Sequence, residues 1–335
     1  MGSYVARRVL QGIFTLFLVF FLLHVLTTLA IQVNGNPALA FFGEKVPTQS
    51  QLLEVKKRYN LDDPCFEQLG NPCLRPFVER LNAYLHGDFG TNLRGDQAVT
   101  EMVATAAPNT LRLFTVVTIT WLIVGMLLGS LAARFRGRLP DHSIRSLSIL
   151  IDAFPVFVML LVYKYIVAVP VERWMDDRFG DEAFPTLMFK PSFDPDHPWA
   201  TVVVPGFLLG VTGSAAFIRL VRASQLENYH ADYVRTARAK GLGDARVTVF
   251  HIIRNSSIPV VTAIGFVFAD ALAGAVITEG LMNIYGMGGL LWRAVRESEV
   301  SVVAGMVSLL AVVVLVVNVL VDLAYAALDP RIRYD

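Results

Sequence analysis

Six long apolar runs divide this sequence and constrain its fold more than any other feature. A helix that crosses a hydrocarbon layer about 30 Å thick needs about 20 predominantly apolar residues. The runs that approach this length are Val9–Val33, Leu113–Ala133, Ser146–Tyr163, Ala200–Ile218, Asn255–Thr278 and Val300–Leu328. The chain of 335 residues is 54% hydrophobic and only 17% charged, which is too few charges to cover a soluble globule. The sequence therefore predicts an all-α membrane protein with six transmembrane helices.

The positive charges predict the orientation of these helices. Lys and Arg gather at the chain ends and in the connections 134–145 and 219–254. The shorter connection carries four arginines, Arg134, Arg136, Arg138 and Arg145. Because cytoplasmic loops are enriched in these residues, both termini and segment 219–254 are expected to be cytoplasmic. Arg7 and Arg8 would also suit a signal peptide, but the run that follows exceeds its apolar core of about 7–15 residues, so we expect a retained helix.

The long outer region 34–108 carries patterns of ordered structure. Thr48 followed by Gln51 resembles a capping box, which would open a helix running through Tyr59. Apolar residues then recur at helical spacing at Leu74, Phe77, Val78, Leu81 and Leu85. A second amphipathic helix is therefore expected against the membrane or against the other helices.

Between these two predicted helices lies CFEQLGNPC, which contains the only two cysteines of the chain, Cys65 and Cys73. Both fall on the side expected to be outside the cytoplasm, where an even pair of cysteines favours a disulfide. The alternative is two free thiols, or a metal pair that lacks its other ligands. We expect a disulfide that closes a small loop.

Motifs of catalysis and nucleotide binding are absent from the sequence. It contains no G-x-x-x-x-G-K-[ST] phosphate loop, no H-E-x-x-H, no paired CxxC and no G-x-S-x-G. The net charge of +1 gives no indication of a nucleic-acid partner. The chain is thus expected to be no enzyme, and uphill movement of a solute would require an ion gradient or a partner ATPase.

One cytoplasmic segment, DYVRTARAKGLGDARVTVFHIIRNSSIP at 232–259, is basic and reads as two short helices broken at Gly241 and Gly243. Such a pair could fit a groove on another protein and transmit motion. On composition alone, an amphipathic helix lying against anionic lipid headgroups is an equal alternative.

The segment resembles the cytoplasmic coupling loop of ABC importer permeases of the dipeptide/oligopeptide class, specifically the B-type of the two permeases. The matching elements are Asp232–Leu242, His251, Arg254–Asn255 and Pro259. The resemblance extends over nearly the whole chain, through Tyr4–Gln11, Gly87–Leu93, Pro108–Leu113, Phe154–Val158, Gly286–Leu291 and Ala327–Arg333. The sequence departs from the family pattern in the CFEQLGNPC insertion and at Gly280–Leu281, after Glu279.

This resemblance implies a type I ABC importer permease in the bacterial inner membrane, forming half of a translocation pore. The implied partners are a second homologous permease, two cytoplasmic ATPase subunits or domains, an extracytoplasmic binding protein and membrane lipids. ATP and Mg would be bound by the ATPases, with no cofactor in this chain. The residues implied to couple the permease to its ATPase are Asp232, Tyr233, Arg235, Ala237, Arg238, Lys240, Gly241 and Leu242.

The expected organisation has three parts. Residues 1–33 hold the N-terminus and the first span, 34–108 form a structured extracytoplasmic insertion, and 109–335 form the permease core. The core includes an extracytoplasmic loop at 170–199 and the cytoplasmic coupling loop at 223–256.

Four carboxylates are the candidates for a role at the pore or gate. Three stand alone in apolar runs, where a charge is costly unless it faces protein or water, so each is a functional candidate. They are Asp152, Asp270 and Asp322, and Glu279 lies at the expected outer end of its helix. Structural hydrogen bonding is the alternative for all three aspartates, and contact with headgroup water is the alternative for Glu279.

The function expected from these observations is ATP-driven import of di- or oligopeptides. Relatives in the same class carry glutathione, nickel chelates or sugars, and no motif in this chain separates these substrates. An ion-coupled secondary transporter is a less favoured alternative, because the two halves of the chain show no repeat and few carboxylates at the membrane midplane.

Overall fold

A computed structural model of the chain describes residues 2–33, 38–39, 42, 46–58, 61, 63–92, 97–256 and 274–328. The described residues are almost entirely helical, and their β structure is limited to an isolated bridge between Thr91 and Ala98. The chain divides into two compact units. Unit 1 combines residues 1–108 with 289–335, and unit 2 comprises residues 109–288.

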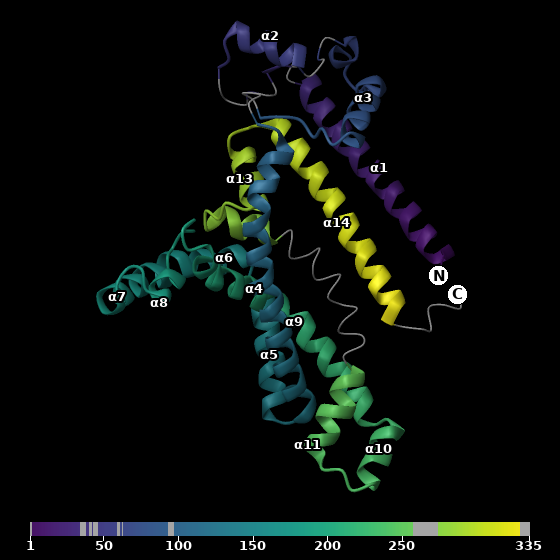
Figure 1. Cartoon of the computed structure of the whole chain (residues 1–335), viewed down its shortest axis with the longest axis vertical. Coiled ribbons are helices and arrows are strands. Elements are labelled where there is room, and N and C mark those ends of the chain that lie inside the picture. Colours follow the sequence, from purple (N-terminus) through teal and green to yellow (C-terminus); the bar gives the residue numbers. More distant parts are fainter. Residues whose placement is uncertain are drawn as a thin grey trace. The chain divides into compact units, whose positions relative to one another are not determined.

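Figure 1 labels the helices. Unit 1 contains α1 (Gly2–Val33), α2 (Gln49–Arg58), a 3-10 turn η2 (Pro64–Glu67), α3 (Leu74–Leu85) and α14 (Val300–Leu328). Unit 2 contains α5 (Leu139–Ala153), α6 (Val156–Val162), the π-helical η3 (Tyr163–Ala168), α7 (Val169–Phe179), α8 (Phe184–Met188), α9 (Pro198–Tyr229), α10 (Asp232–Ala239), α11 (Asp244–Val247) and the π-helical η4 (Thr248–Ile253). The helices α4 (Val99–Arg134) and α13 (Met287–Arg296) cross the boundary between the units.

Four of the described helices are long and apolar enough to span a membrane, namely α1, α4, α9 and α14. The expected third span, Ser146–Tyr163, is not one straight helix, because α5 and the helical stretch Val156–Phe179 meet at 90°. Pro155 causes this break, since proline lacks an N–H donor and disfavours helical geometry at the residue before it. Phe154 accordingly has extended backbone angles, φ −86° and ψ 121°. Counted as one bent span, the pair brings the total among the described residues to five.

The expected fifth span, Asn255–Thr278, falls mostly outside the described residues. Residues 274–281 at its end are helical, as are residues 254–256 at its start. The sixth expected span coincides with α14. The expected second span is the apolar part of a longer helix, because α4 begins at Val99.

Close backbone approach joins α4 to α9 within unit 2. Each helix carries a G-x-x-x-G pair, GMLLG at 125–129 and GFLLG at 206–210. A Cβ atom added to Gly210 would lie 2.6 Å from Thr120 Cβ and 3.1 Å from the Val117 carbonyl oxygen. Small residues at this spacing let membrane helices pack with their backbones close together. Within unit 2, α4 and α9 therefore pack with their backbones close together at these glycines.

In unit 1, α3 packs across α1, and α1 packs along α14 (Figure 1). Phe77, the one fully buried side chain of α3, contacts Phe17 and Phe21 edge to face at ring distances of 5.7 and 5.3 Å. Tyr84 contacts Phe20 and accepts a hydrogen bond from Ser308 of α14 at 3.2 Å. The second predicted amphipathic helix is thus confirmed, and its aromatic face packs on α1.

The predicted capping box is also confirmed. The backbone N–H of Thr48 donates to Gln51 Oε1 at 2.9 Å, and the N–H of Gln51 donates to Thr48 Oγ1 at 3.4 Å. These reciprocal bonds satisfy two backbone donors that a helix start would otherwise leave unpaired. The helix α2 begins directly after Thr48 and is described to Arg58.

Candidate functional site

The basic segment after α9 folds into the two short helices that its sequence predicts. The helix α10 ends at Ala239, and Gly241 has a φ of +81°, a conformation that suits glycine. Gly243, by contrast, has φ −64° and ψ 148° and caps the start of α11. The chain then continues without a turn through η4 to residue 256.

A small hydrophobic cluster holds α10 and α11 together. Val234 and Ala237 of α10 pack with Val247 and Ile252, and these four side chains are buried. The partly buried side chains against them are Tyr229, Tyr233 and Leu242. We call this packed unit, residues 229–253, the helical pair. In Figure 1 it lies at the end of α9.

The charged side chains of α10 and of the turn after it are exposed. Asp232, Arg235, Arg238 and Lys240 are exposed, whereas Tyr233, Ala237 and Leu242 lie in or against the cluster. Arg238 Nε pairs with Asp244 Oδ1 at 3.3 Å across the Gly241 turn. The eight predicted coupling residues therefore divide into a turn, an inner packing face and a charged outer face.

The four carboxylates that are candidates for the pore or gate differ in their surroundings. Asp152 accepts a hydrogen bond from Arg219 Nη2 at 3.2 Å and lies beside a cavity of about 330 Å³ lined also by Trp121 and Gly213. Glu279 is fully buried, and its carboxylate lies against Gly286, where no room remains for a Cβ atom. Asp270 lies outside the described residues. Asp322 lies in α14, whose side chains are described only as far as Leu320.

Two segments that resemble family motifs meet next to Glu279. Asn109 Nδ2 donates to the Tyr285 carbonyl at 3.0 Å, and the Met287 N–H donates to Thr110 Oγ1 at 2.8 Å. The turn that holds Glu279 against Gly286 is thus fixed to the start of the unit 2 part of α4.

Sequence reasoning missed a buried ion pair in unit 2. Arg222 of α9 donates from Nε and Nη2 to the two carboxylate oxygens of Asp141 in α5, both at 2.7 Å. In the sequence, Asp141 looks like an ordinary acidic residue in the first turn of a helix, and Arg222 counts only toward the positive charge of its loop. The only feature of the sequence that pointed to this ion pair was the position of Asp141 and Arg222 near the ends of two apolar runs.

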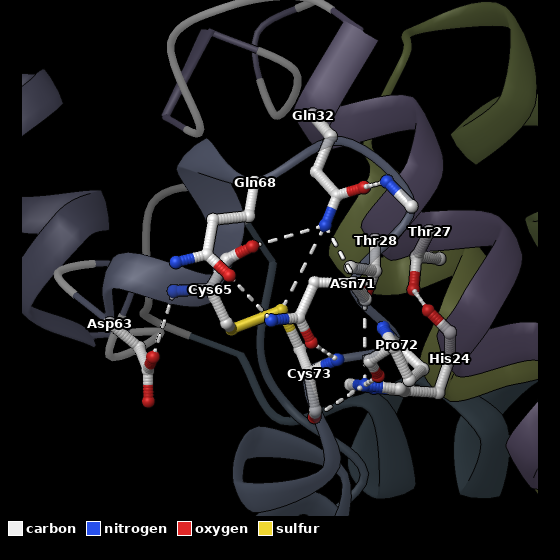
Figure 2. Close-up of a disulfide and its surroundings, with 11 residues drawn as sticks. His24, Thr27, Thr28, Gln32, Asp63, Cys65, Gln68, Asn71, Pro72 and Cys73 are labelled. Atoms are coloured by element: carbon white, nitrogen blue, oxygen red, sulfur yellow. Dashed lines mark hydrogen bonds between the residues drawn. A yellow bond between two sulfur atoms is a disulfide. The ribbon is translucent and has the colours of Figure 1, made fainter.

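The predicted disulfide between Cys65 and Cys73 is present, and α1 holds the loop that it closes (Figure 2). Gln32 Nε2 donates to the carbonyl oxygens of Cys65 and Asn71 at 3.1 and 2.8 Å. The buried His24 ring approaches the Pro72 and Cys73 carbonyl oxygens with Nε2, at 3.1 Å each. Because carbonyls only accept, Nε2 is the protonated nitrogen.

Across the residues that the structure describes, no group of three or more His, Cys, Asp or Glu side chains could hold a metal ion. The arrangement instead provides a packed, charged projection at the end of a long membrane helix.

Comparison with known proteins shows the family of this chain. Residues 125–334 match the family described as the binding-protein-dependent transport system inner membrane component. The chain is 31% identical to the dipeptide transport system permease protein DppB of Escherichia coli, over 90% of this chain and 91% of that protein. It is also 31% identical to the glutathione transport system permease protein GsiC of Escherichia coli and of Shigella dysenteriae, over the full length of each. This multi-pass protein of the bacterial inner membrane therefore belongs to the permeases of ABC importers, in the dipeptide/oligopeptide class.

Proposed function

We propose that this chain is one of two homologous permease subunits of an ATP-driven importer of di- or oligopeptides. The similarity to permeases named for a dipeptide and for glutathione supports a short peptide as substrate. The observation that carries the proposal is the helical pair, which combines a buried hydrophobic interior with an exposed charged face.

In this proposal the helical pair docks into a cytoplasmic ATPase. A compact unit on the end of α9 can be pushed as a body, because its two helices share one hydrophobic cluster. The outer side chains Asp232, Arg235, Arg238 and Lys240 would contact the ATPase, and Gly241 would set the angle between the helices. The ATPases would bind ATP and Mg and supply the free energy.

The proposed topology has six spans and cytoplasmic termini, with Asn255–Thr278 as the fifth span. Residues 34–108 and 170–199 would face outward, toward an extracytoplasmic binding protein that delivers the peptide. Asp152, Asp270, Glu279 and Asp322 remain the candidates for a role at the pore or gate. Asp152, with a cavity at its side, is the best placed of the described ones to meet a solute.

Purification from the native membrane in mild detergent tests this proposal. We expect the chain to bring with it a second six-helix permease, ATPase chains and a binding protein, whose bound solute would identify the substrate. A co-purified binding protein loaded with a nickel chelate or a sugar would support the importer but show that its substrate is not a peptide. Repeated recovery of the chain alone or as a homodimer, without any ATPase, would contradict the proposal and favour an ion-driven carrier.

A further inference from the structure

Three polar side chains near the end of α9 each reach a different element of unit 2. Arg222 pairs with Asp141 of α5, Ser224 Oγ donates to the Ser256 carbonyl at 3.1 Å, and Gln225 Nε2 donates to Ser130 Oγ of α4 at 2.7 Å. We call this set the α9 junction; its residues are Ser130, Asp141, Arg222, Ser224, Gln225 and Ser256.

The junction is mostly buried, although its Arg222 side chain is 20% exposed, and its contacts have a specific geometry. Asp141 is 1% exposed, and it receives a third hydrogen bond from the Gly137 N–H at 2.9 Å. Gln225 and Ser256 are also buried. A bidentate arginine–carboxylate pair restricts both position and angle, and losing either partner would leave a buried charge uncompensated. The junction therefore holds α9 in one arrangement relative to α4 and α5.

The helical pair begins one turn beyond the junction. Asn228 Nδ2 donates to the Ser224 carbonyl at 2.8 Å, and Tyr233 Oη donates to Asn228 Oδ1 at 2.5 Å. Tyr229 packs into the hydrophobic cluster of the helical pair. A continuous series of contacts thus connects α10 to the ends of α4, α5 and the segment after η4.

We infer that Asp141, Arg222 and Gln225 are positioning residues for coupling, which make the helical pair move as one rigid body with α4, α5 and α9. A push on the helical pair then displaces the membrane helices instead of bending the end of α9. The role in coupling rests on the proposed function, whereas the rigidity of the junction does not.

A second ion pair between the same two helices supplies a matched control. Arg219 and Asp152 are joined by one contact at 3.2 Å, and their side chains are 47% and 52% exposed. The Arg222–Asp141 pair is more enclosed, with side chains 20% and 1% exposed, and it has two contacts at 2.7 Å. Arg219→Gln therefore removes the same kind of charge, one turn away on α9, without affecting the junction.

Distance measurements between two spin labels test the rigidity in the full-length chain in lipid nanodiscs. Labels at Ser143→Cys on α5 and Arg235→Cys on α10 use exposed positions, and the disulfide-bonded Cys65 and Cys73 do not react. We expect one narrow distance distribution in the parent and in Arg219→Gln, and a broad one in Arg222→Gln. Gln225→Leu, which leaves no buried charge unpaired, should broaden it too. Narrow distributions in both junction variants would overturn the inference.

Reconstitution with the ATPases and binding protein tests the coupling role. Arg222→Gln and Gln225→Leu should keep the ATPases bound but move roughly tenfold less peptide per ATP hydrolysed. The double variant Asp141→Arg with Arg222→Asp, which exchanges the two charges, should recover part of the peptide transport per ATP. Unchanged coupling in both single variants would refute the role assigned to the junction. If the parent complex imported no peptide at all, the proposed function would fail, while the distance measurement would still decide whether the junction is rigid.

Discussion

At the scale of single residues, Lys190 and Asp194 form a largely enclosed ion pair in the segment between α8 and α9. Lys190 Nζ donates to Asp194 Oδ2 at 2.7 Å, and the side chains are 28% and 19% exposed. The hydrogen bond from Lys190, with another from the Asp196 N–H, holds the pKa of the Asp194 carboxyl below its ordinary value of 3.8. A carboxyl with a depressed pKa stabilises the fold above its unfolded pKa, and this contribution is lost as pH falls through the folded pKa.

We therefore expect hydrogen-exchange protection factors of residues 189–197 to fall as the pH drops below about 4. Lys190→Met should lower protection at neutral pH and flatten this pH dependence, and Lys190→Arg, which retains the positive charge, should largely preserve it. A pH profile that is the same in the parent and in Lys190→Met would show that the ion pair does not stabilise this loop.

Contacts between individual residues were predictable where the two partners are close in sequence. Thr48 and Gln51 are three residues apart, so the capping box follows from the sequence, as does the disulfide between the only two cysteines. Asp141 and Arg222 are separated by 81 residues. Nothing in the local pattern of either residue specifies the other, so their pairing emerges only when α5 packs on α9.

At the scale of helices, the close contact of α4 with α9 predicts a strong effect of side-chain size. Gly210→Leu would force atoms into the space held by Thr120 and the Val117 carbonyl, and overpacking of this kind typically costs about 1–3 kcal/mol. Thermal unfolding in detergent should show a clearly lowered midpoint. Phe207→Leu on the same helix, at a side chain 48% exposed, is the control and should shift the midpoint little. Equal midpoints for both variants would argue against this packing.

The contributions of the disulfide and of α1 to the stability of the loop can be measured separately. Replacing both cysteines by serine should destabilise the loop by about 2.5 kcal/mol, the chain-entropy value for closing a loop of this size. Gln32→Leu keeps the disulfide but removes the hydrogen bonds to the Cys65 and Asn71 carbonyls. Limited proteolysis within residues 63–73 should therefore be fastest in the double serine variant and intermediate in Gln32→Leu. Parent-like resistance in Gln32→Leu would mean that α1 does not hold the loop.

The largest departure at the scale of helices concerns the third expected span, which is broken at Pro155. Hydropathy averages over a window, and it registers Phe154 and Pro155 as apolar residues within one run. The backbone, however, cannot continue a regular helix through this proline, and α5 and α6 diverge. Pro155 marks the position of the break in the sequence, but no local pattern gives the 90° angle between the two helices.

At the scale of the whole molecule, the sequence was sufficient for the class and the family. The apolar runs predicted a helical membrane protein, and the motif segments predicted an importer permease, in agreement with the family match over residues 125–334. The helical pair was predictable because Gly241 and Gly243 interrupt it locally. The junction that connects it to α4 and α5 was not, since its contacts join α9 to residues 81 and 95 positions away in the sequence.

The central claim is that the helical pair converts ATP hydrolysis into peptide movement, and two glycines provide its most direct test. Both have open space around the position of a Cβ atom, but only Gly241 has a positive φ. Serine at Gly243 suits a helix N-cap, whereas serine at Gly241 is strained by roughly 1–2 kcal/mol and should change the angle between α10 and α11.

Peptide uptake and ATP hydrolysis should be measured together in proteoliposomes that contain the full complex. We predict that Gly241→Ser lowers the peptide moved per ATP several-fold, by about 5-fold or more, and that Gly243→Ser leaves this ratio unchanged. Wild-type uptake per ATP in Gly241→Ser would contradict the coupling role of the helical pair.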